Sequence, residues 1–219
     1  MRLLAIDTAT EACSVALTGD DGAITERYQI SPFGHSDQLL PMAAELLGEA
    51  GLNLQDLEAV AFDSGPGSFT GIRIGLGVAQ GLALGLNLRL IGISSLMVLA
   101  EGCSADAVLS AIDARMGQVY WARLKRDSGY AEGWMWCDEP RVSDPSAMPD
   151  LSSNEVRIGS GWERYLEVTE GRESSVEERP DTFPRAAWVA VIAGRVLTSS
   201  AKSNSLLPYP TYVRNIVTG

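Results

Sequence analysis

The stretch from Asp63 to Leu86, DSGPGSFTGIRIGLGVAQGLALGL, holds the residues whose types and spacing point most clearly to chemistry. It opens as a turn rich in glycine and proline and continues with the spacing of a helix. Such a turn at a helix N-terminus presents free backbone N–H groups and the positive end of the helix dipole. A phosphate group is therefore one ligand that this segment could hold.

The residues that normally accompany a phosphate loop are absent from this segment. Neither a Gly-Lys-Ser/Thr ending nor a Gly-x-Gly-x-x-Gly pattern occurs in it. The structural alternative is a tight turn made by Gly65, Pro66 and Gly67, with Ser68 as the cap of the following helix. We favour this alternative and expect no catalytic phosphate site here.

The glycines within the expected helix, residues 69–86, recur at four-residue spacing. Gly71 and Gly75 form one such series, and Gly77, Gly81 and Gly85 form another. Each glycine costs about 1 kcal/mol relative to alanine inside a helix unless something compensates. Small residues at this spacing let another helix approach closely. The spacing leaves open whether that helix belongs to this chain or to a partner.

Two aspartates, Asp7 and Asp113, each end an apolar run in a repeated Ala-Ile-Asp, about half the chain apart. Some nucleotide-binding folds place metal–nucleotide aspartates at such strand ends and follow them with glycine. Here Thr8 and Ala114 follow instead. Asp7, Thr8 and Asp113 are therefore candidates for a vestigial nucleotide site, and the favoured alternative is that each aspartate caps its own turn.

Histidine and cysteine give little support for catalysis or metal binding. His35 is the single histidine, so two histidines on one helix cannot hold zinc. No serine or cysteine motif accompanies it as a nucleophile. Cys13, Cys103 and Cys137 are odd in number and far apart, which fits neither a disulfide framework nor a zinc site. We expect no catalytic residue and no metal ligand in this chain.

The elements that would position these residues alternate between strands and helices. A strand with a returning strand is expected in 3–17 and again in 108–124, which indicates an internal duplication. Pro41 is expected in the first turn of a helix. Alternation of this kind predicts an α/β fold. Between the two copies we expect a helix at 36–50, a strand at 58–63, the helix at 69–86, a strand at 89–93 and a helix from 94 to 101.

The second half carries weaker patterns, and we expect a smaller lobe there. The predicted division is an N-terminal α/β lobe at 1–102 and a reduced C-terminal α/β lobe at 103–219. Within the second lobe we expect a strand at 156–161, an exposed loop at 172–180, a helix at 184–197 and an extended tail at 206–214.

The composition excludes some classes of protein. The 219 residues are 46% hydrophobic and 21% charged, with a net charge of −11. That charge disfavours tight binding of nucleic acid by the chain alone, because phosphates need a basic footprint. Glycines, Arg73 and Asn87 interrupt the longest apolar runs, so we expect no membrane span. The N-terminus starts as a strand without a cleavage site, so a cytoplasmic protein is expected.

Several motifs together resemble one family. SGPGSFTGIRIG at 64–75 closely resembles the signature of the bacterial TsaB family, also called YeaZ. The Asp63-Ser64 entry to this loop departs from it, since smaller residues would be expected there. The resemblance covers nearly the whole chain. The other motifs that carry it are AIDTAT at 5–10, His35-Ser36, ISSL at 93–96, IDAR at 112–115 and Pro210-x-Tyr-x-Arg214.

The resemblance implies a duplicated actin/hexokinase-like (ribonuclease H-like) α/β fold in two lobes. It implies a role in adding a threonylcarbamoyl group to N6 of the adenosine beside the anticodon of tRNAs that read codons beginning with adenosine. By resemblance the chain is a catalytically silent paralogue of TsaD that pairs with TsaD and works with TsaE. ATP and a metal then belong to the partner subunits. tRNA is reached only through the complex.

The resemblance also implies an interface. Family members dimerise through the first two helices of the N-terminal lobe, either with TsaD or, when alone, as a homodimer. Alternatives are an independent ATP-dependent phosphotransferase and a peptidase; the single histidine counts against the peptidase. The contact candidates on the two helices are Leu39, Met42, Leu46, Gly71, Ile74, Gly75, Val78 and Leu82.

Overall fold

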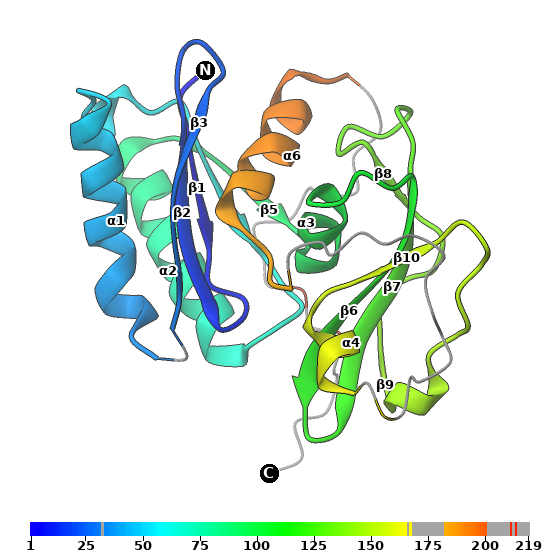
Figure 1. The fold of residues 1–219 in the computed structure, drawn as a ribbon. Helices are drawn as coiled ribbons and strands as arrows, with labels where there is room; N and C mark the ends of the chain where they lie inside the picture. Colours follow the sequence, from blue (N-terminus) through cyan, green and yellow to red (C-terminus); the bar gives the residue numbers. More distant parts are fainter. Residues whose placement is uncertain (32, 166, 168–181, 201–210, 212, 214–219) are drawn as a thin grey trace.

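The computed structural model consists of two β-sheets with helices between them and on the outer face of the first sheet (Figure 1). It describes residues 1–31, 33–165, 167, 182–200, 211 and 213. The exposed loop predicted at 172–180 lies outside the described residues, as does the tail predicted at 206–214, except for Thr211 and Val213.

The first sheet has five strands in the order β3-β2-β1-β4-β5. β1 pairs in antiparallel with β2 and in parallel with β4, so it is central and buried throughout. The alternation of its side chains sends one set to each face of the sheet. The strands are β1 (Leu3–Asp7), β2 (Ala12–Thr18), β3 (Ile24–Ile30), β4 (Ala59–Asp63) and β5 (Arg89–Ile93).

The second sheet repeats the beginning of this plan. β6 pairs in antiparallel with β7 and in parallel with β10, as β1 does with β2 and β4. The duplication predicted from the repeated Ala-Ile-Asp is thus visible in the strand pairing. The strands are β6 (Ala107–Arg115), β7 (Gln118–Arg126), β8 (Trp134–Trp136), β9 (Arg141–Ser143), which pairs with β7, and β10 (Val156–Ile158).

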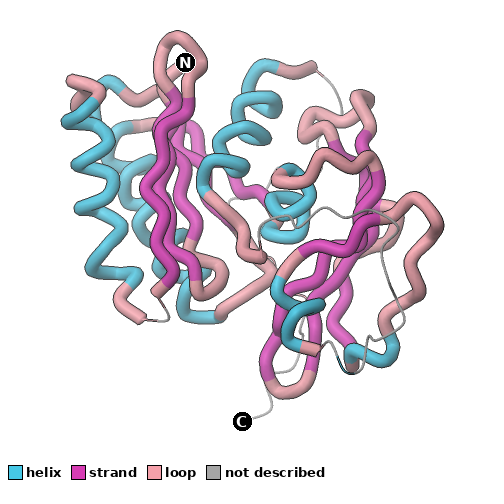
Figure 2. Tube along the Cα trace, viewed as in Figure 1, coloured by secondary structure: helices cyan, strands magenta, loops and turns pink. Residues whose placement is uncertain are grey.

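Helices cover the first sheet on both faces (Figure 2). α1 and α2 pack on one face, over side chains such as Leu4, Ile6 and Phe62. α3 and α6 pack on the other face and fill the space toward the second sheet. The bounds are α1 (His35–Glu49), α2 (Phe69–Leu86), α3 (Ser95–Glu101), α4 (Ser160–Arg164) and α6 (Ala186–Thr198), with 3-10 turns η1 (Leu54–Asp56) and η2 (Pro145–Ala147).

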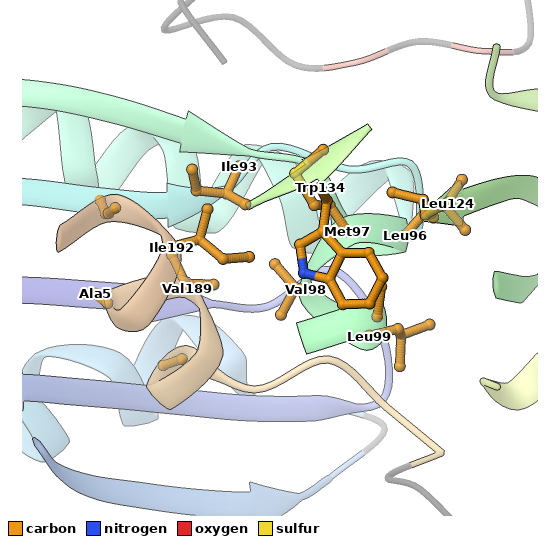
Figure 3. Packing of buried hydrophobic residues seen from close by; sticks show 14 of the residues in the cluster. Ala5, Ile93, Leu96, Met97, Val98, Leu99, Leu124, Trp134, Val189 and Ile192 are labelled. Atoms are coloured by element: carbon orange, nitrogen blue, oxygen red, sulfur yellow. The ribbon is translucent and has the colours of Figure 1, made fainter. Parts of the chain in front are cut away.

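A single buried core joins the two sheets, with Trp134 near its centre (Figure 3). Its indole N–H donates to Oε2 of Glu101 at 2.7 Å. Arg195 of α6 also binds Glu101, at 3.0 and 2.5 Å, so an ion pair with a buried carboxylate and a partly exposed guanidinium joins α3 and α6. Although α6 follows the predicted boundary at residue 102, it packs on the first sheet through Val189 and Ile192.

Most predicted elements are confirmed, with three differences. The helix at 69–86, the strand at 89–93 and the cap at Ser68 are confirmed. The strand predicted at 156–161 ends at Ile158, and α4 begins at Ser160. Pro41 lies inside α1 rather than in its first turn, because the helix already starts at His35. β3 was not predicted; its half-exposed sequence ITERYQI is polar enough to resemble a loop.

Candidate functional site

The N-terminus of α2 is packed against the turn between β1 and β2. Ser68 caps the helix by accepting from the Gly71 N–H at 3.2 Å. The Ser68 N–H itself donates to the Ala9 carbonyl at 2.7 Å. A Cβ atom at Gly67 would collide with that same carbonyl. The turn between β1 and β2 therefore lies directly against the N-terminal turn of α2.

Two glycines of α2 allow this close approach. A Cβ at Gly71 would collide with the Thr8 carbonyl, and one at Gly75 would lie 2.5 Å from Thr8 Oγ1. Thr8 uses the short distance to donate from Oγ1 to the Gly71 carbonyl at 2.8 Å. These two glycines are thus required for packing within the chain. For them, the close contact is with this chain's own turn and not with a partner.

The other glycine series faces away from the sheet. Gly77, Gly81 and Gly85 are exposed, and a Cβ at any of them would meet nothing within 4 Å. The step from Gly75 to Gly77 is two residues, which turns about 200° around a helix. The two series therefore lie on opposite faces of α2, and only the second is open to a partner.

The eight predicted contact residues divide by burial. Leu39, Leu46, Gly71 and Gly75 are buried in the chain's own core, so they offer no surface in this conformation. Met42, Ile74, Val78 and Leu82 are half-buried at the edges of the two helices. The large exposed side chains there are Leu40, at 53%, and Leu84, at 87%, which the prediction did not include.

α2 is more apolar than the sequence analysis allowed. By length and composition alone it could cross a membrane, with a mean hydropathy of 1.3 over 18 residues, and 28% of that window is buried. The prediction of no such run is corrected, because its glycines lower hydropathy only slightly. An apolar helix with one face on a sheet leaves its other face available for contact.

A cleft of about 660 Å³ opens between the N-termini of α1 and α2 on one side and the β6–β7 hairpin on the other. Phe33 and Phe69 stand at it, exposed at 83% and 57%. Of the three vestigial-site candidates, Asp113 lines the cleft, whereas Asp7 and Thr8 are buried beneath its floor. The structure therefore does not bring the three together around one space.

Both aspartates form the turns that the structural alternative predicts. The Ala9 N–H donates to Asp7 Oδ1 at 2.9 Å, and the Arg115 N–H donates to Asp113 Oδ1 at 2.9 Å. Each carboxylate thus accepts from the backbone two residues further on, as in an Asx turn. This geometry explains why an aspartate ends both apolar runs without any ligand.

His35 and the cysteines show structural environments. His35 Nε2 lies 3.2 Å from the Ala12 carbonyl, and burial lowers the pKa of its imidazole. Cys13 and Cys103 are buried free thiols, and Cys137 is exposed. Among the residues that the structure describes, no three His, Cys, Asp or Glu side chains gather to hold a metal ion.

Solved structures define the class of protein. Two structures from Pseudomonas aeruginosa, one described as YeaZ and one as an uncharacterized protein with similarity to peptidase YEAZ, are each 34% identical to this chain. They give TM-scores of 0.80 and 0.82 and cover 96% and 97% of this chain and 100% and 99% of their own. The ethanolamine utilization protein EutJ from Carboxydothermus hydrogenoformans gives 0.52 at 12% identity over 88% of this chain and 90% of its own, which shows the fold alone. The chain has the duplicated actin/hexokinase-like fold, as expected.

Sequence relatives narrow the class to one family. The model of the family described as "TsaD: tRNA N6-adenosine threonylcarbamoyltransferase" matches residues 29–132. The tRNA threonylcarbamoyladenosine biosynthesis protein TsaB of Escherichia coli K12 is 42% identical over 99% of this chain and 96% of its own. The protein of that name from Haemophilus influenzae is 38% identical over 100% and 95%. The chain belongs to the TsaB family, also called YeaZ.

Proposed function

We propose that this protein is a non-catalytic subunit of the machinery that makes tRNA threonylcarbamoyladenosine, and that it docks to and supports TsaD. The observation that carries the proposal is 42% identity, over nearly the whole chain, to a protein named for that biosynthesis. TsaD is then the subunit that transfers the threonylcarbamoyl group to N6 of the adenosine beside the anticodon, in tRNAs reading codons that begin with adenosine.

The docking surface in this proposal is the exposed face of α1 and α2. Gly77 and Gly81 leave its centre flat, and Leu40 and Leu84 supply exposed apolar area. Glu45 and Glu49 of α1 pair with Arg27 of β3, which directs that charged side of α1 away from α2. A flat apolar face lets a second helix pair pack closely. The same face serves a homodimer when the chain is alone and TsaD when it is present.

The proposal assigns nucleotide, metal and tRNA to the partners. The packing of Gly67 and Gly71 against Ala9 and Thr8 supports this, because these glycines are used for contacts within the chain. A net charge of −11 supports contact with tRNA only within the complex, in which we also place TsaE. We further propose that the protein works in the cytoplasm, where tRNA is modified.

The test is assembly measured by solution mass, first alone and then with TsaD added. Leu84→Glu places a charge on the proposed surface. Because the Leu84 side chain is 87% exposed, this change should not disturb the fold of the chain itself. We expect it to abolish the homodimer and weaken TsaD binding at least about 100-fold, since a buried unpaired charge costs several kcal/mol. Gly75→Glu would be uninformative because it would disrupt the contact with Thr8.

The control is Lys125→Glu, which makes a larger charge change, of two units instead of one, on an exposed position of β7. It should assemble as the unaltered chain does. Full assembly of Leu84→Glu with TsaD would contradict the docking surface. Binding of ATP–Mg at sub-millimolar concentration by the isolated chain, lost in Asp113→Ala, would instead favour a phosphotransferase.

A further inference from the structure

The first sheet contains two buried carboxyl groups side by side, beyond anything that the proposed docking role requires. β1 and β4 pair in parallel with Ile6 opposite Phe62, so the next residues, Asp7 and Asp63, end the two strands at the same level. In-register residues on neighbouring parallel strands point to the same face. Asp7 is 0% exposed and Asp63 2% exposed.

Each carboxyl group has one satisfied oxygen and one that lacks a donor. Asp7 Oδ1 accepts from the Ala9 N–H at 2.9 Å. Asp63 Oδ1 accepts from the Gly65 N–H at 2.8 Å and from the Ser95 hydroxyl. Oδ2 of both residues is buried and has no hydrogen-bond partner in the described part of the chain. A buried polar atom without a partner lowers stability. Because the two unpaired oxygens belong to neighbouring carboxyl groups, one common cause can account for both.

A proton between the two Oδ2 atoms is that explanation. The two carboxyl groups lie within hydrogen-bonding reach of each other. If both were ionised, two negative charges would face each other in the core. If one is protonated, its O–H donates to the other and both orphan oxygens are satisfied at once. We propose that Asp7 and Asp63 share one proton, and that this proton locks the ends of β1 and β4 beneath the loop that starts α2.

The donors indicate which group holds the proton. Asp63 accepts from two donors besides Asp7, whereas Asp7 accepts from one. The negative charge is therefore better stabilised on Asp63, and the proton lies on Asp7. Burial, and then the charge of Asp63, raise the pKa of Asp7 well above its ordinary value. Burial also raises the pKa of Asp63, to about 7, although its hydrogen bonds oppose this.

Among the residues that the structure describes, no cation acts on the two carboxyl groups in place of the proton. Glu26 of β3 adds a further negative charge that acts on Asp7, and its own partner is Arg185 at the start of α6, at 2.6 Å. The N-terminus of α6 is held by Ser14, which accepts from the Ala186 N–H at 2.8 Å. From the opposite side Cys13 faces Asp7 as a thiol, and its pKa is raised to about 12 by burial and by that aspartate. α3 contributes the neutral Ser95.

The sign of the pH dependence follows from these directions. Both carboxyl groups bind protons more tightly in the folded chain than in the unfolded chain, where their pKa values are ordinary. Their contribution to stability is complete below the ordinary aspartate range and is lost as pH rises through the folded values, the lower of which is about 7. The folded chain should therefore lose stability from neutral to alkaline pH.

Asp7→Asn tests the lock, because the amide mimics the protonated carboxyl group. Its oxygen can accept from Ala9 and its NH₂ can donate to Asp63 at every pH. Between pH 6 and pH 9 we expect the Tm of the unaltered chain to fall by about 5 °C more than that of Asp7→Asn. The variant should then be the more stable of the two at pH 9. Parallel Tm curves would overturn the proposal.

Two controls keep the result specific. Asp113→Asn changes the equivalent aspartate, whose neighbour is Arg115 rather than a carboxylate, and its Tm curve should parallel that of the unaltered chain. Potassium or magnesium that raises the Tm of the unaltered chain but not of Asp7→Asn would show a cation in place of the proton and overturn the proposal.

A spectroscopic measurement stands independently of how the variant folds. The infrared band of a protonated carboxyl group should be present in the unaltered chain at pH 7, when exposed carboxyl groups are ionised, and should disappear as pH rises further. Its absence at pH 7 would overturn the shared proton.

Discussion

The turn after β1 and the turn after β6 begin in the same way. In each, an aspartate carboxylate accepts from the backbone N–H two residues further on, Asp7 from Ala9 and Asp113 from Arg115. In each half, a glycine that follows the parallel partner strand lies so close to the first strand or its end that a Cβ would collide: Gly71 with Thr8, just after Asp7, and Gly159 with Ala111, two residues before Asp113. The duplication thus preserves close glycine packing, although at different positions along the strand, as well as a strand order.

The two aspartates differ in what surrounds them. Asp7 is fully buried and meets Asp63 at the end of the neighbouring parallel strand. Asp113 is partly exposed; Tyr165 donates its hydroxyl hydrogen to it at 3.0 Å, and Arg115 pairs with it at 3.4 Å. β10 ends at Ile158 opposite Ser110, short of Asp113, so that strand brings no carboxylate to it. The same turn is therefore neutralised by a proton in one half, in our proposal, and by an arginine in the other.

The helices that follow the glycines differ as well. α2 has 18 residues and presents a long apolar outer face, whereas α4 has 5 residues as the structure describes it. A helix of one turn has no face that could pair with another helix. The difference indicates that close glycine packing serves the fold in both halves, and that only the first half has a helix long enough for the docking surface that we propose.

The largest expected effect tests the shared packing. Gly71→Ala and Gly159→Ala each place a methyl group against a backbone carbonyl, of Thr8 and of Ala111. We expect each to lower the free energy of unfolding by about 2–4 kcal/mol, measured by urea denaturation, because backbone cannot move aside cheaply. Gly159 has a positive φ of 102°, so its methyl group adds backbone strain as well as the collision. Gly161→Ala places a methyl group against the same Ala111 without a positive φ, so it tests the packing alone. A neutral Gly161→Ala would show that the second half does not need this close packing.

An intermediate effect is expected at the residue after each aspartate. Thr8 donates to the Gly71 carbonyl at 2.8 Å, and its counterpart Ala114 has no hydroxyl. Thr8→Ala therefore makes the first turn resemble the second, and it should lower the free energy of unfolding by about 1–2 kcal/mol. The measurement is urea denaturation at pH 6, where the Asp7–Asp63 pair is protonated. If Thr8→Ala and the unaltered chain have the same free energy of unfolding, the turn is held by backbone contacts alone.

Much of this comparison could be predicted from the sequence. The repeated Ala-Ile-Asp, the alternating strands and the glycine loop are local patterns, and they correctly gave the duplication, the bounds of α2 and the cap at Ser68. The actin/hexokinase-like fold came from the resemblance and is supported by the solved relatives. Features that depend on the residues of one helix, strand or turn could be predicted in this way.

Long-range features could not be predicted. The parallel register that sets Asp63 beside Asp7 depends on residues far apart in the chain, and Asp63 drew attention only as a departure from the family motif. Glycine has no side chain to mark which face of a helix is inside, so the prediction names Gly71 and Gly75 as contact candidates in place of Gly77 and Gly81. The two-residue step between the series was the available signal, since it places them on opposite faces.

The smallest expected effect separates the two glycine series of α2. A methyl group at Gly81 meets nothing within 4 Å, so Gly81→Ala should raise the free energy of unfolding of the isolated monomer by about 0.5–1 kcal/mol through helix propensity. The measurement is urea denaturation at a concentration at which the solution mass is that of a monomer. Gly77→Ala, in the same open series, should behave alike.

The methyl group of Gly81→Ala should weaken assembly with TsaD, because it holds two helices apart where the face needs to be flat. A variant that is more stable alone and weaker in the complex would show that this glycine serves contact rather than folding, whereas Gly71→Ala should lose stability before any partner is added.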